Sequence, residues 1–136
     1  MLKVLDLFSG IGGFSLGLER TGGFETVAFC EIEDYPRRVL EKHWPDVPIY
    51  EDVREVEYVE TDIVTAGFPC QDLSIAGRQA GIDGDRSGLY WEVVRIAGNI
   101  RPRYVVMENV TNLLVGPTER RGQWFGAVLR GLVEIG

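Results

Sequence analysis

The sequence predicts an α/β fold, in which a doubly wound and mostly parallel sheet carries helices on both faces. Short apolar runs of strand type alternate with amphipathic helical segments along the chain, an order typical of parallel sheets. Glycine or proline interrupts the sequence between these segments. With 136 residues, of which 45% are hydrophobic, the chain suits one domain over residues 1–136 with a single core.

The N-terminal segments predict a strand, a tight turn and a helix. Residues 2–8 form an apolar run that leads into a glycine-rich turn at residues 9–13. The helix expected over residues 14–19 ends at Gly22 and Gly23, since glycine is the usual residue after a helix.

A second strand and helix follow in the same order. Residues 25–29 alternate as a strand, and Asp34 is expected to cap a helix that has Pro36 in its first turn. Pro45 stops this helix. Residues 48–50 then predict a short third strand.

The middle of the chain contains a fourth strand and a long irregular segment. Residues 63–66 are apolar and end at a glycine. Residues 71–88 contain four glycines and no sustained period, which is typical of a functional lid or of a disordered segment. Ser87 is expected to cap the next helix. Its apolar face is predicted to comprise Leu89, Val93, Ile96, Ala97 and Ile100.

The last segments predict a fifth strand and a final helix. Residues 104–107 are apolar and are followed by Glu108. The helix expected after Pro117 has Gly136 at its C-cap position. Its predicted buried positions are Phe125, Val128, Leu129, Leu132 and Val133.

Composition limits the class of protein. The net charge of -7 argues mildly against extensive phosphate contact by this surface. The two cysteines, Cys30 and Cys70, favour reduced thiols in a cytoplasmic protein. No apolar run reaches the ~18 residues of a membrane span, and no histidine–cysteine spacing indicates a metal site. We expect His43 on a helix surface or in a helix cap. The tryptophans, which are Trp44, Trp91 and Trp124, are expected to pack.

A cysteine stands directly after the fourth strand, in the stretch 66–71. Pro69 forbids helix at Phe68 and removes a backbone donor, so Cys70 begins a loop. The carboxyl ends of parallel strands are where open α/β sheets bind ligands. An unpaired cysteine is nevertheless most often a small buried hydrophobe. By itself, this stretch does not decide whether Cys70 is an inert residue or a nucleophile.

The turn at residues 6–13 resembles a nucleotide-binding fingerprint, with Glu31 at the end of the second strand. Its Gly-x-Gly-Gly spacing suits a dinucleotide less well, and Asp6 would repel a pyrophosphate. S-adenosyl-L-methionine, which carries a sulfonium and an amino group, tolerates such an acid better. The alternative is a tight turn without a ligand. Because Glu31 and Asp52 each follow a strand, we favour a ligand-binding site over a turn without a ligand.

With these residues in place, the chain resembles the cytosine-C5 DNA methyltransferase family. The motifs stand in the family's order over nearly the whole chain, although Ser87 occupies a position where the family usually has glycine. The matching segments are Asp6–Phe14, Glu31-Ile32, Asp52-Val53, Gly67-Phe68-Pro69-Cys70-Gln71, Arg86–Tyr90 and Glu108-Asn109-Val110.

The resemblance implies a Rossmann-like S-adenosyl-L-methionine-dependent methyltransferase fold, apparently incomplete, with residues 1–136 as the N-terminal portion of the catalytic domain. The implied catalytic residues are Cys70, Gln71, Glu108 and Asn109. The implied cofactor-binding residues are Phe8, Ser9, Gly10, Ile11, Gly12, Gly13, Glu31, Ile32, Asp52, Val53, Gly67, Pro69 and Leu89. No metal is implied.

The resemblance also implies a mechanism and a setting. Attack by the Cys70 thiolate on cytosine C6 would activate C5 for methylation, while Glu108 stabilises the ring at N3 and Asn109 orients the motif. The base would be flipped out of DNA, with residues 71–88 as a closing lid. Such enzymes act in restriction-modification, and a bacterial, archaeal or phage origin is expected.

Other interpretations stay open at this point. The family's target recognition region does not occur in these 136 residues. A natural truncation, a split enzyme and a partial sequence all explain this, so a second chain is an expected partner besides DNA. Little activity is expected from the chain alone. A non-catalytic cofactor-binding or oligomerising remnant is one alternative function, and C5 methylation of cytosine in tRNA is another.

Overall fold

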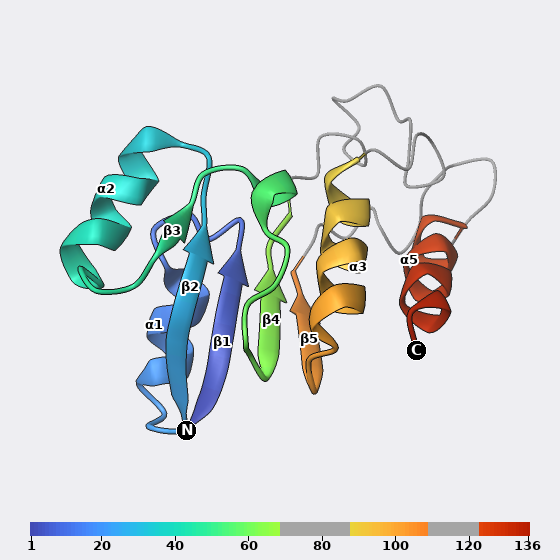
Figure 1. Ribbon diagram of the computed structural model, residues 1–136, viewed down its shortest axis with the longest axis horizontal. Helices are drawn as coiled ribbons and strands as arrows, with labels where there is room; N and C mark the ends of the chain where they lie inside the picture. The colour runs from blue at the N-terminus through green and yellow to red at the C-terminus, as the bar shows by residue number, and fades with distance from the viewer. Residues whose placement is uncertain (69–87, 109–122) are drawn as a thin grey trace.

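The structure is a computed structural model that describes residues 1–68, 88–108 and 123–136 (Figure 1). The strands are β1 (Leu2–Leu7), β2 (Phe24–Cys30), β3 (Ile49–Tyr50), β4 (Ile63–Ala66) and β5 (Tyr104–Met107). The helices are α1 (Gly13–Glu19), α2 (Asp34–His43), the 3-10 helix η1 (Val53–Glu55), α3 (Leu89–Ile100) and α5 (Gln123–Glu134). Each described element was predicted from the sequence except η1.

The strands form one sheet in the order β3-β2-β1-β4-β5, and every described pair is parallel. The chain first moves outward from β1 to β3 and then returns to place β4 on the other side of β1 (Figure 1). This is the doubly wound order that the alternation of strands and helices predicts. A crevice is therefore expected where β1 and β4 end.

The main core lies between the sheet and α3. Alternate residues of β1 and β4 point to this side, because side chains along a strand alternate between the two faces. The buried cluster consists of Leu5, Leu7, Ala28, Cys30, Val53, Val56, Val64, Ala66, Val93, Ile96 and Ile100. The predicted apolar positions of α3 that belong to it are Val93, Ile96 and Ile100. Ala97 is buried as well.

The opposite face of the sheet carries α1 and α2. Phe29 of β2 is fully buried there, and the Trp44 ring meets it edge-on with centroids 5.1 Å apart. The Trp44 Nε1 donates a hydrogen bond of 2.9 Å to the Glu19 carboxylate of α1. The predicted packing role of Trp44 is thereby confirmed. His43 is exposed at the end of α2, as expected for a helix-surface residue.

The structure corrects the predicted buried face of the last helix. Phe125, Leu129 and Val133 of α5 are 38%, 47% and 78% exposed. Val128 is buried as predicted, and Leu132 is half-buried. An amphipathic pattern marks an apolar stripe but does not show which part of the stripe meets a neighbouring element.

Small residues decide how α5 packs on α3. Gly131 faces Tyr90 so closely that a Cβ atom there would lie 2.7 Å from the Tyr90 hydroxyl oxygen. That hydroxyl donates a hydrogen bond of 2.7 Å to the Val128 carbonyl oxygen. Trp91 packs edge-on against Tyr90, with centroids 5.1 Å apart, which confirms a packing role for this tryptophan as well. The helices approach along the glycine side rather than along the side with the largest apolar residues.

Part of the α1 face of the sheet is open. Tyr104 and Val106 of β5, the edge strand of the described sheet, are 55% and 42% exposed. They border an apolar groove of about 400 Å³. The groove is lined by Leu2, Phe14, Leu18, Phe24, Ile63, Thr65, Tyr104 and Val106.

Two predicted helix caps differ from the structure. Glu33 is the N-cap of α2, so Asp34 is the first helical residue instead of the cap. An acid in the first turn still interacts favourably with the helix dipole. Gly88 is the N-cap of α3. The residue predicted for that role, Ser87, lies outside the described residues, as does the segment 71–87. Within the described ranges, no helix combines the length and apolarity needed to cross a membrane.

Gly12 and Gly13 offer a matched test of the turn before α1. Gly12 has a φ of 90°, and a Cβ atom there would lie 2.7 Å from the Trp44 ring and 3.0 Å from Leu40. Gly13 has nothing within 4 Å of its Cβ position. In urea denaturation, Gly12→Ala should lower the free energy of unfolding by at least about 2 kcal/mol. Gly13→Ala should leave it unchanged or raise it by up to about 1 kcal/mol. Equal effects would contradict this packing.

Candidate functional site

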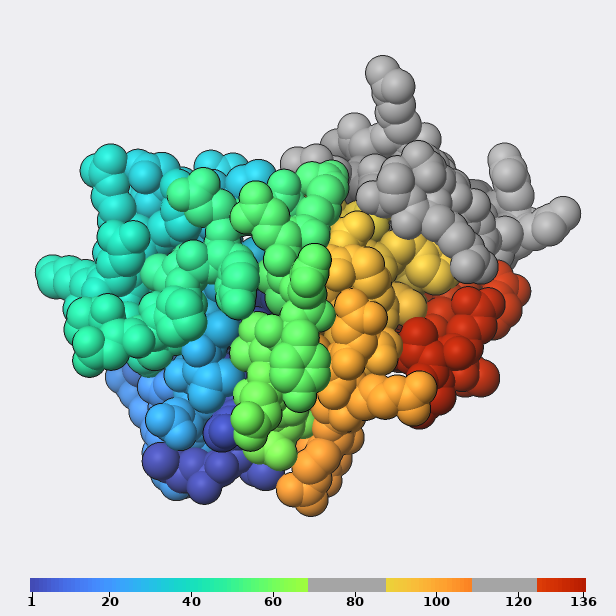
Figure 2. Space-filling view, viewed as in Figure 1, coloured from blue at the N-terminus to red at the C-terminus, as the bar shows by residue number. Residues whose placement is uncertain are grey.

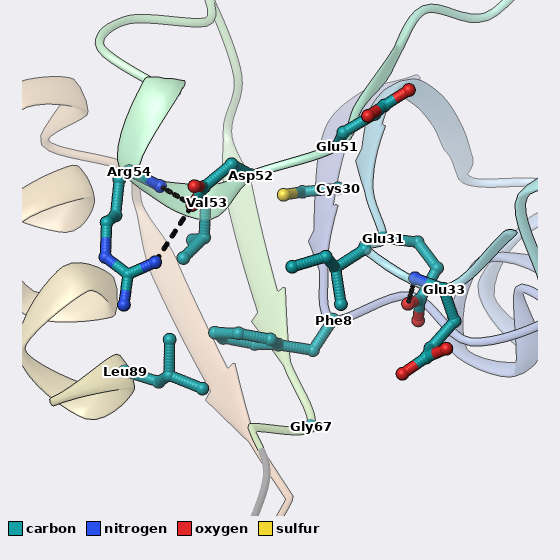
Figure 3. A pocket seen from close by; sticks show the side chains of 11 residues that line it. Phe8, Cys30, Glu31, Glu33, Glu51, Asp52, Val53, Arg54, Gly67 and Leu89 are labelled. Atoms are coloured by element: carbon teal, nitrogen blue, oxygen red, sulfur yellow. Dashed lines mark hydrogen bonds and ion pairs between the residues drawn. The ribbon is translucent and has the colours of Figure 1, made fainter.

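A cavity of about 260 Å³ opens at the carboxyl edge of the sheet, beside the ends of β1, β2 and β4 (Figure 3). This is the crevice expected at the point where the order of the strands reverses. Its volume is just below the range of about 300–1,000 Å³ typical of small-molecule sites. The lining residues are Phe8, Cys30, Glu31, Ile32, Glu33, Glu51, Asp52, Val53, Arg54, Gly67 and Leu89.

The structure brings together many of the residues predicted to bind a cofactor. Seven of them line the cavity, namely Phe8, Glu31, Ile32, Asp52, Val53, Gly67 and Leu89. They come from five segments that are far apart in the sequence. The turn residues Ser9, Gly10, Ile11, Gly12 and Gly13 lie outside the lining, and Pro69 lies outside the described residues. A cofactor contact for each of these residues stays a prediction.

The turn after β1 has an unusual backbone. Phe8, Gly10 and Gly12 all have positive φ angles, of 54°, 55° and 90°. A left-handed conformation at a residue other than glycine costs roughly 1–2 kcal/mol, so the surrounding structure must hold Phe8 in place. The Phe8 ring lies in the middle of the cavity, between Leu89 and Glu33 in Figure 3. The strained backbone therefore presents an aromatic face to the cavity.

Ser9 connects the ends of β1 and β2 from inside the turn. Its hydroxyl oxygen lies 2.5 Å from the Asp6 carbonyl oxygen and 3.1 Å from that of Cys30, and it accepts from the Cys30 N–H at 3.2 Å. Its own N–H donates to the Cys30 carbonyl oxygen at 3.0 Å. Ser9 is 8% exposed. Its polar groups therefore hold the two strand ends together.

Glu31 is the most firmly held acid of the cavity. One carboxylate oxygen accepts from the Gly10 N–H and the other from the Glu33 N–H, each at 2.8 Å. The side chain thus bridges the glycine turn and the loop after β2. A carboxylate oxygen can accept two hydrogen bonds, so both oxygens keep capacity for donors on a ligand, such as sugar hydroxyls.

Asp52 shapes the opposite wall of the cavity. Its Oδ1 accepts from the Arg54 N–H at 2.9 Å, which makes it the N-cap of η1. The Arg54 guanidinium lies 3.6 Å from the same oxygen (Figure 3). The cap begins the short helix that carries Val53, a cavity residue that is 5% exposed.

Asp6 does not face the cavity, although the sequence suggested an acid beside the ligand. Its carboxylate is 1% exposed and accepts from the Thr65 hydroxyl at 2.7 Å and the Ser15 hydroxyl at 2.8 Å. The side chain points to the α1 face because it alternates with Leu5 and Leu7 along β1. Burial raises the pKa of Asp6 to about 6, against the lowering effect of the two hydroxyl donors.

The predicted catalytic acid lies next to the cavity. The Glu108 N–H donates to the Ala66 carbonyl oxygen at 3.0 Å, so Glu108 follows β5 beside the end of β4. Its Oε2 lies 3.4 Å from the position that a Cβ on Gly67 would take. A Cβ atom on residue 67 would thus be in ordinary van der Waals contact with this carboxylate, so the acid lies close to a cavity residue. Cys70, Gln71 and Asn109, the other predicted catalytic residues, lie outside the described residues.

Sequence reasoning missed four residues of the cavity, Cys30, Glu33, Glu51 and Arg54. All four are sequence neighbours of predicted residues, so adjacency to the predicted residues at the strand ends was the available signal. Burial raises the pKa of the Cys30 thiol to about 12, helped by the nearby acids Asp52, Glu31 and Glu55. Cys30 is therefore an uncharged wall of the cavity rather than a nucleophile.

The cavity combines a carboxylate rim with apolar walls. Its acids are Glu31, Glu33, Glu51 and Asp52, and its apolar side chains include Phe8, Ile32, Val53 and Leu89. This surface suits a flat ring that carries hydroxyl and amino groups, and it disfavours a phosphate. Within the described ranges, no group of three or more histidine, cysteine or acidic side chains is arranged to hold a metal ion.

The chain is similar to known proteins over nearly its whole length. The sequence matches the family described as C-5 cytosine-specific DNA methylase over residues 2–136. It is 45% identical over 140 residues to the type II methyltransferase M2.BsuMI of Bacillus subtilis, covering 99% of this chain and 35% of that protein. It is 33% identical over 151 residues to the type II methyltransferase M.Sau3AI of Staphylococcus aureus, covering 99% of this chain and 37% of that protein. The chain thus spans about a third of the length of these curated relatives.

A solved structure supports the fold. Spodoptera frugiperda DNMT2 is similar with a TM-score of 0.72 at 20% identity, over 99% of this chain and 41% of that one. The Rossmann-like methyltransferase fold expected from the motifs is therefore confirmed for the described residues.

The buried acid Asp6 predicts a pH-dependent stability. Its pKa in the folded protein, about 6, lies above the ordinary value of 3.8, so the folded state holds the proton more tightly. The resulting stabilisation is complete below pH 3.8 and is lost as the pH rises through about 6. Relative to Asp6→Asn, the free energy of unfolding should fall by up to about 3 kcal/mol between pH 4 and pH 7. Denaturation curves of both proteins across this range check it, and parallel pH profiles would refute it.

Proposed function

Because the chain belongs to the C-5 cytosine-specific DNA methylase family, we propose that it forms the cofactor-binding and nucleophile-bearing part of a DNA (cytosine-5-)-methyltransferase. In this proposal, residues 1–136 are the N-terminal portion of the catalytic domain. The substrate is cytosine in DNA, and S-adenosyl-L-methionine supplies the methyl group when bound.

The observation that carries the proposal is the acid-lined cavity at the switch point of the sheet. Glu31 is held there by two backbone donors, so its carboxylate is fixed before any ligand arrives. Preorganisation of this kind lowers the cost of binding. The carboxylate would accept hydrogen bonds from the ribose hydroxyls of the cofactor, and Asp52 from its adenine amine.

Apolar side chains of the cavity fit the remaining surface of the cofactor. Phe8, Ile32 and Leu89 lie around the space between the two acids. Ile32 is 66% exposed, which leaves its side chain available to a ring stacked against it. The surplus of acids favours a ligand that carries positive charge, which agrees with a sulfonium compound.

The proposed chemistry uses Cys70 and Glu108. Attack of the Cys70 thiolate on C6 forms a carbon–sulfur bond and makes C5 nucleophilic, while Glu108 shares a proton with N3 to accommodate the developing charge. After C5 receives the methyl group, water accepts the C5 proton, the electron pair of the C5–H bond restores the C5=C6 double bond, and the carbon–sulfur bond breaks to return the free thiolate. The position of Glu108 beside Gly67, at the cavity, supports its assignment. Asn109 and Gln71 would orient these groups.

Full activity is proposed to require polypeptide beyond these 136 residues, either a continuation of the chain or a second chain. The threefold greater length of the curated relatives supports this. The exposed Tyr104 and Val106 on the open face of the sheet supply an apolar surface for such a segment. A role in restriction-modification accords with the type II methyltransferases among the relatives, and a cytoplasmic location stays a prediction.

Calorimetric titration tests the cofactor half of the proposal. The chain should bind S-adenosyl-L-methionine, and Glu31→Gln should raise the Kd by about 10–100-fold, because charged hydrogen bonds contribute about 1.5–3 kcal/mol. Glu25→Gln is the matched control, since Glu25 is an exposed acid at the other end of the same strand. Absence of binding, even with a C-terminal segment from a relative supplied, would refute the cofactor assignment.

Covalent trapping tests the nucleophile. With cofactor and a duplex that contains 5-fluorocytosine, the chain plus the C-terminal segment of a relative should form a stable adduct, and Cys70→Ser should form none. The fluorine cannot leave as a proton does, so the enzyme stays attached. Cys30→Ser should still form the adduct, because Cys30 is a buried neutral thiol. Trapping on tRNA and not on DNA would favour the RNA alternative. Cofactor-free dimers without any adduct would favour an oligomerising remnant.

A further inference from the structure

Arg95 on α3 reaches across to the segment that forms one wall of the cavity. Its Nη1 donates to the Val56 carbonyl oxygen at 2.9 Å and its Nη2 to the Val53 carbonyl oxygen at 3.1 Å. A longer contact of 3.5 Å joins Nη2 to the Arg54 carbonyl oxygen. Figure 1 shows η1 beside the first half of α3, and Figure 2 shows the same segments, in green and yellow-orange, in contact.

The carbonyl groups that Arg95 binds belong to η1 and the residue after it. This 3-10 helix has three residues, too few to hold its own shape, since its internal bonds are few and geometrically poor. It contains one wall of the cavity, formed by Val53 and Arg54 together with its N-cap Asp52. The guanidinium therefore supplies donors to carbonyl groups of the helix and of the residue after it, behind this wall.

Glu92 orients the guanidinium. Its Oε2 accepts from the Arg95 Nε at 2.8 Å, one turn earlier on the same helix. The Glu92 and Arg95 side chains are 18% and 34% exposed, so the pair is largely shielded by protein. With Nε held by the acid, the two terminal nitrogens point towards η1. A planar group with several donors can make this set of bonds, whereas lysine offers a single point charge.

Arg95 joins the two sides of the cavity. Leu89, in the first turn of the same helix α3, lines the cavity from one side, and Asp52, Val53 and Arg54 line it from the adjoining side. Arg95 itself is not among the lining residues. We propose that Arg95, oriented by Glu92, is a positioning residue that sets the separation of α3 and η1 and thereby the fit of the cavity for the adenosine part of the cofactor. This inference rests on the function proposed above.

Variants of Arg95 test the inference by calorimetry on the full chain. Arg95→Met keeps the unbranched apolar stem of the side chain and removes every donor, so the Kd for S-adenosyl-L-homocysteine should rise about tenfold or more at unchanged stoichiometry. Arg95→Lys should recover part of the affinity. Glu92→Gln should give a smaller loss, because the guanidinium stays but is less firmly oriented. 5′-Methylthioadenosine, which lacks the amino acid tail, should lose affinity by the same factor as the longer ligand.

A matched control and a local readout separate positioning from general loss of stability. Arg38→Met removes the same charge from an arginine that is 73% exposed and pairs only with Asp34 among the described ion pairs, so the Kd should not change. Hydrogen exchange in Arg95→Met should accelerate at the amides of residues 54–56, but not at those of β1. If Arg95→Met misfolds, the Kd values of Arg95→Lys and Glu92→Gln are compared with that of the wild type instead.

The possible results distinguish the two proposals. If the wild-type chain binds neither ligand, with a C-terminal segment supplied, the proposed function fails and this inference fails with it. If the wild type binds and Arg95→Met binds equally well, only the role of Arg95 is overturned. Lower stoichiometry at unchanged Kd, or exchange accelerated throughout the sheet, would also overturn it, because these results indicate unfolding instead of a displaced wall.

Discussion

The buried carboxylate of Asp6 is the interaction on which the rest of the arrangement depends. It lies in β1 and accepts from Thr65 of β4 and Ser15 of α1. It therefore joins the two strands whose carboxyl ends form the crevice, and fixes the start of α1 behind them. Phe8 begins the turn two residues after Asp6, and Gly67 follows two residues after Thr65. Burial of an acid is costly, and the raised pKa expresses that cost. The hydroxyl groups of Thr65 and Ser15 offset part of this cost, and their hydrogen bonds fix the position of β1 relative to β4 and α1.

The polar groups near the cavity differ in whether they bind only other protein groups or also face the cavity. Ser9, Asp6 and Arg95 direct their polar atoms to the protein and hold strands and helices in place. Glu31 does both, because its oxygens bind backbone N–H groups and still border the cavity. Arg37 of α2 holds the other side in a similar way, donating to the Ile32 carbonyl oxygen at 2.6 Å. Arginines from the two faces of the sheet thus support the walls of the cavity from behind.

Much of the fold and a large part of the site could be predicted from the sequence, for a simple geometrical reason. Residues that follow parallel strands must meet at one edge, so Glu31, Asp52 and Gly67 could be assigned to one site before their distances were known. The orientation of side chains near that edge could not. Asp6 was expected beside a ligand because it precedes the glycine turn, but the strand alternation directs it to the opposite face. The burial of Phe125 was wrongly predicted because its helix packs along Gly131.

The sequence by itself determined the order of the elements, the parallel sheet and the family, since these follow from local periodicity, turn residues and short motifs. Only the tertiary structure decided what each turn residue does. Residue 12 must be glycine because a Cβ atom there would clash with Trp44, which lies 32 positions later in the chain. Arg95 binds carbonyl groups about 40 positions earlier. Contacts of this kind depend on how helices from different parts of the chain pack on the sheet. No local pattern encodes them, because the spacing between the partners is set by the fold and not by the period of either element.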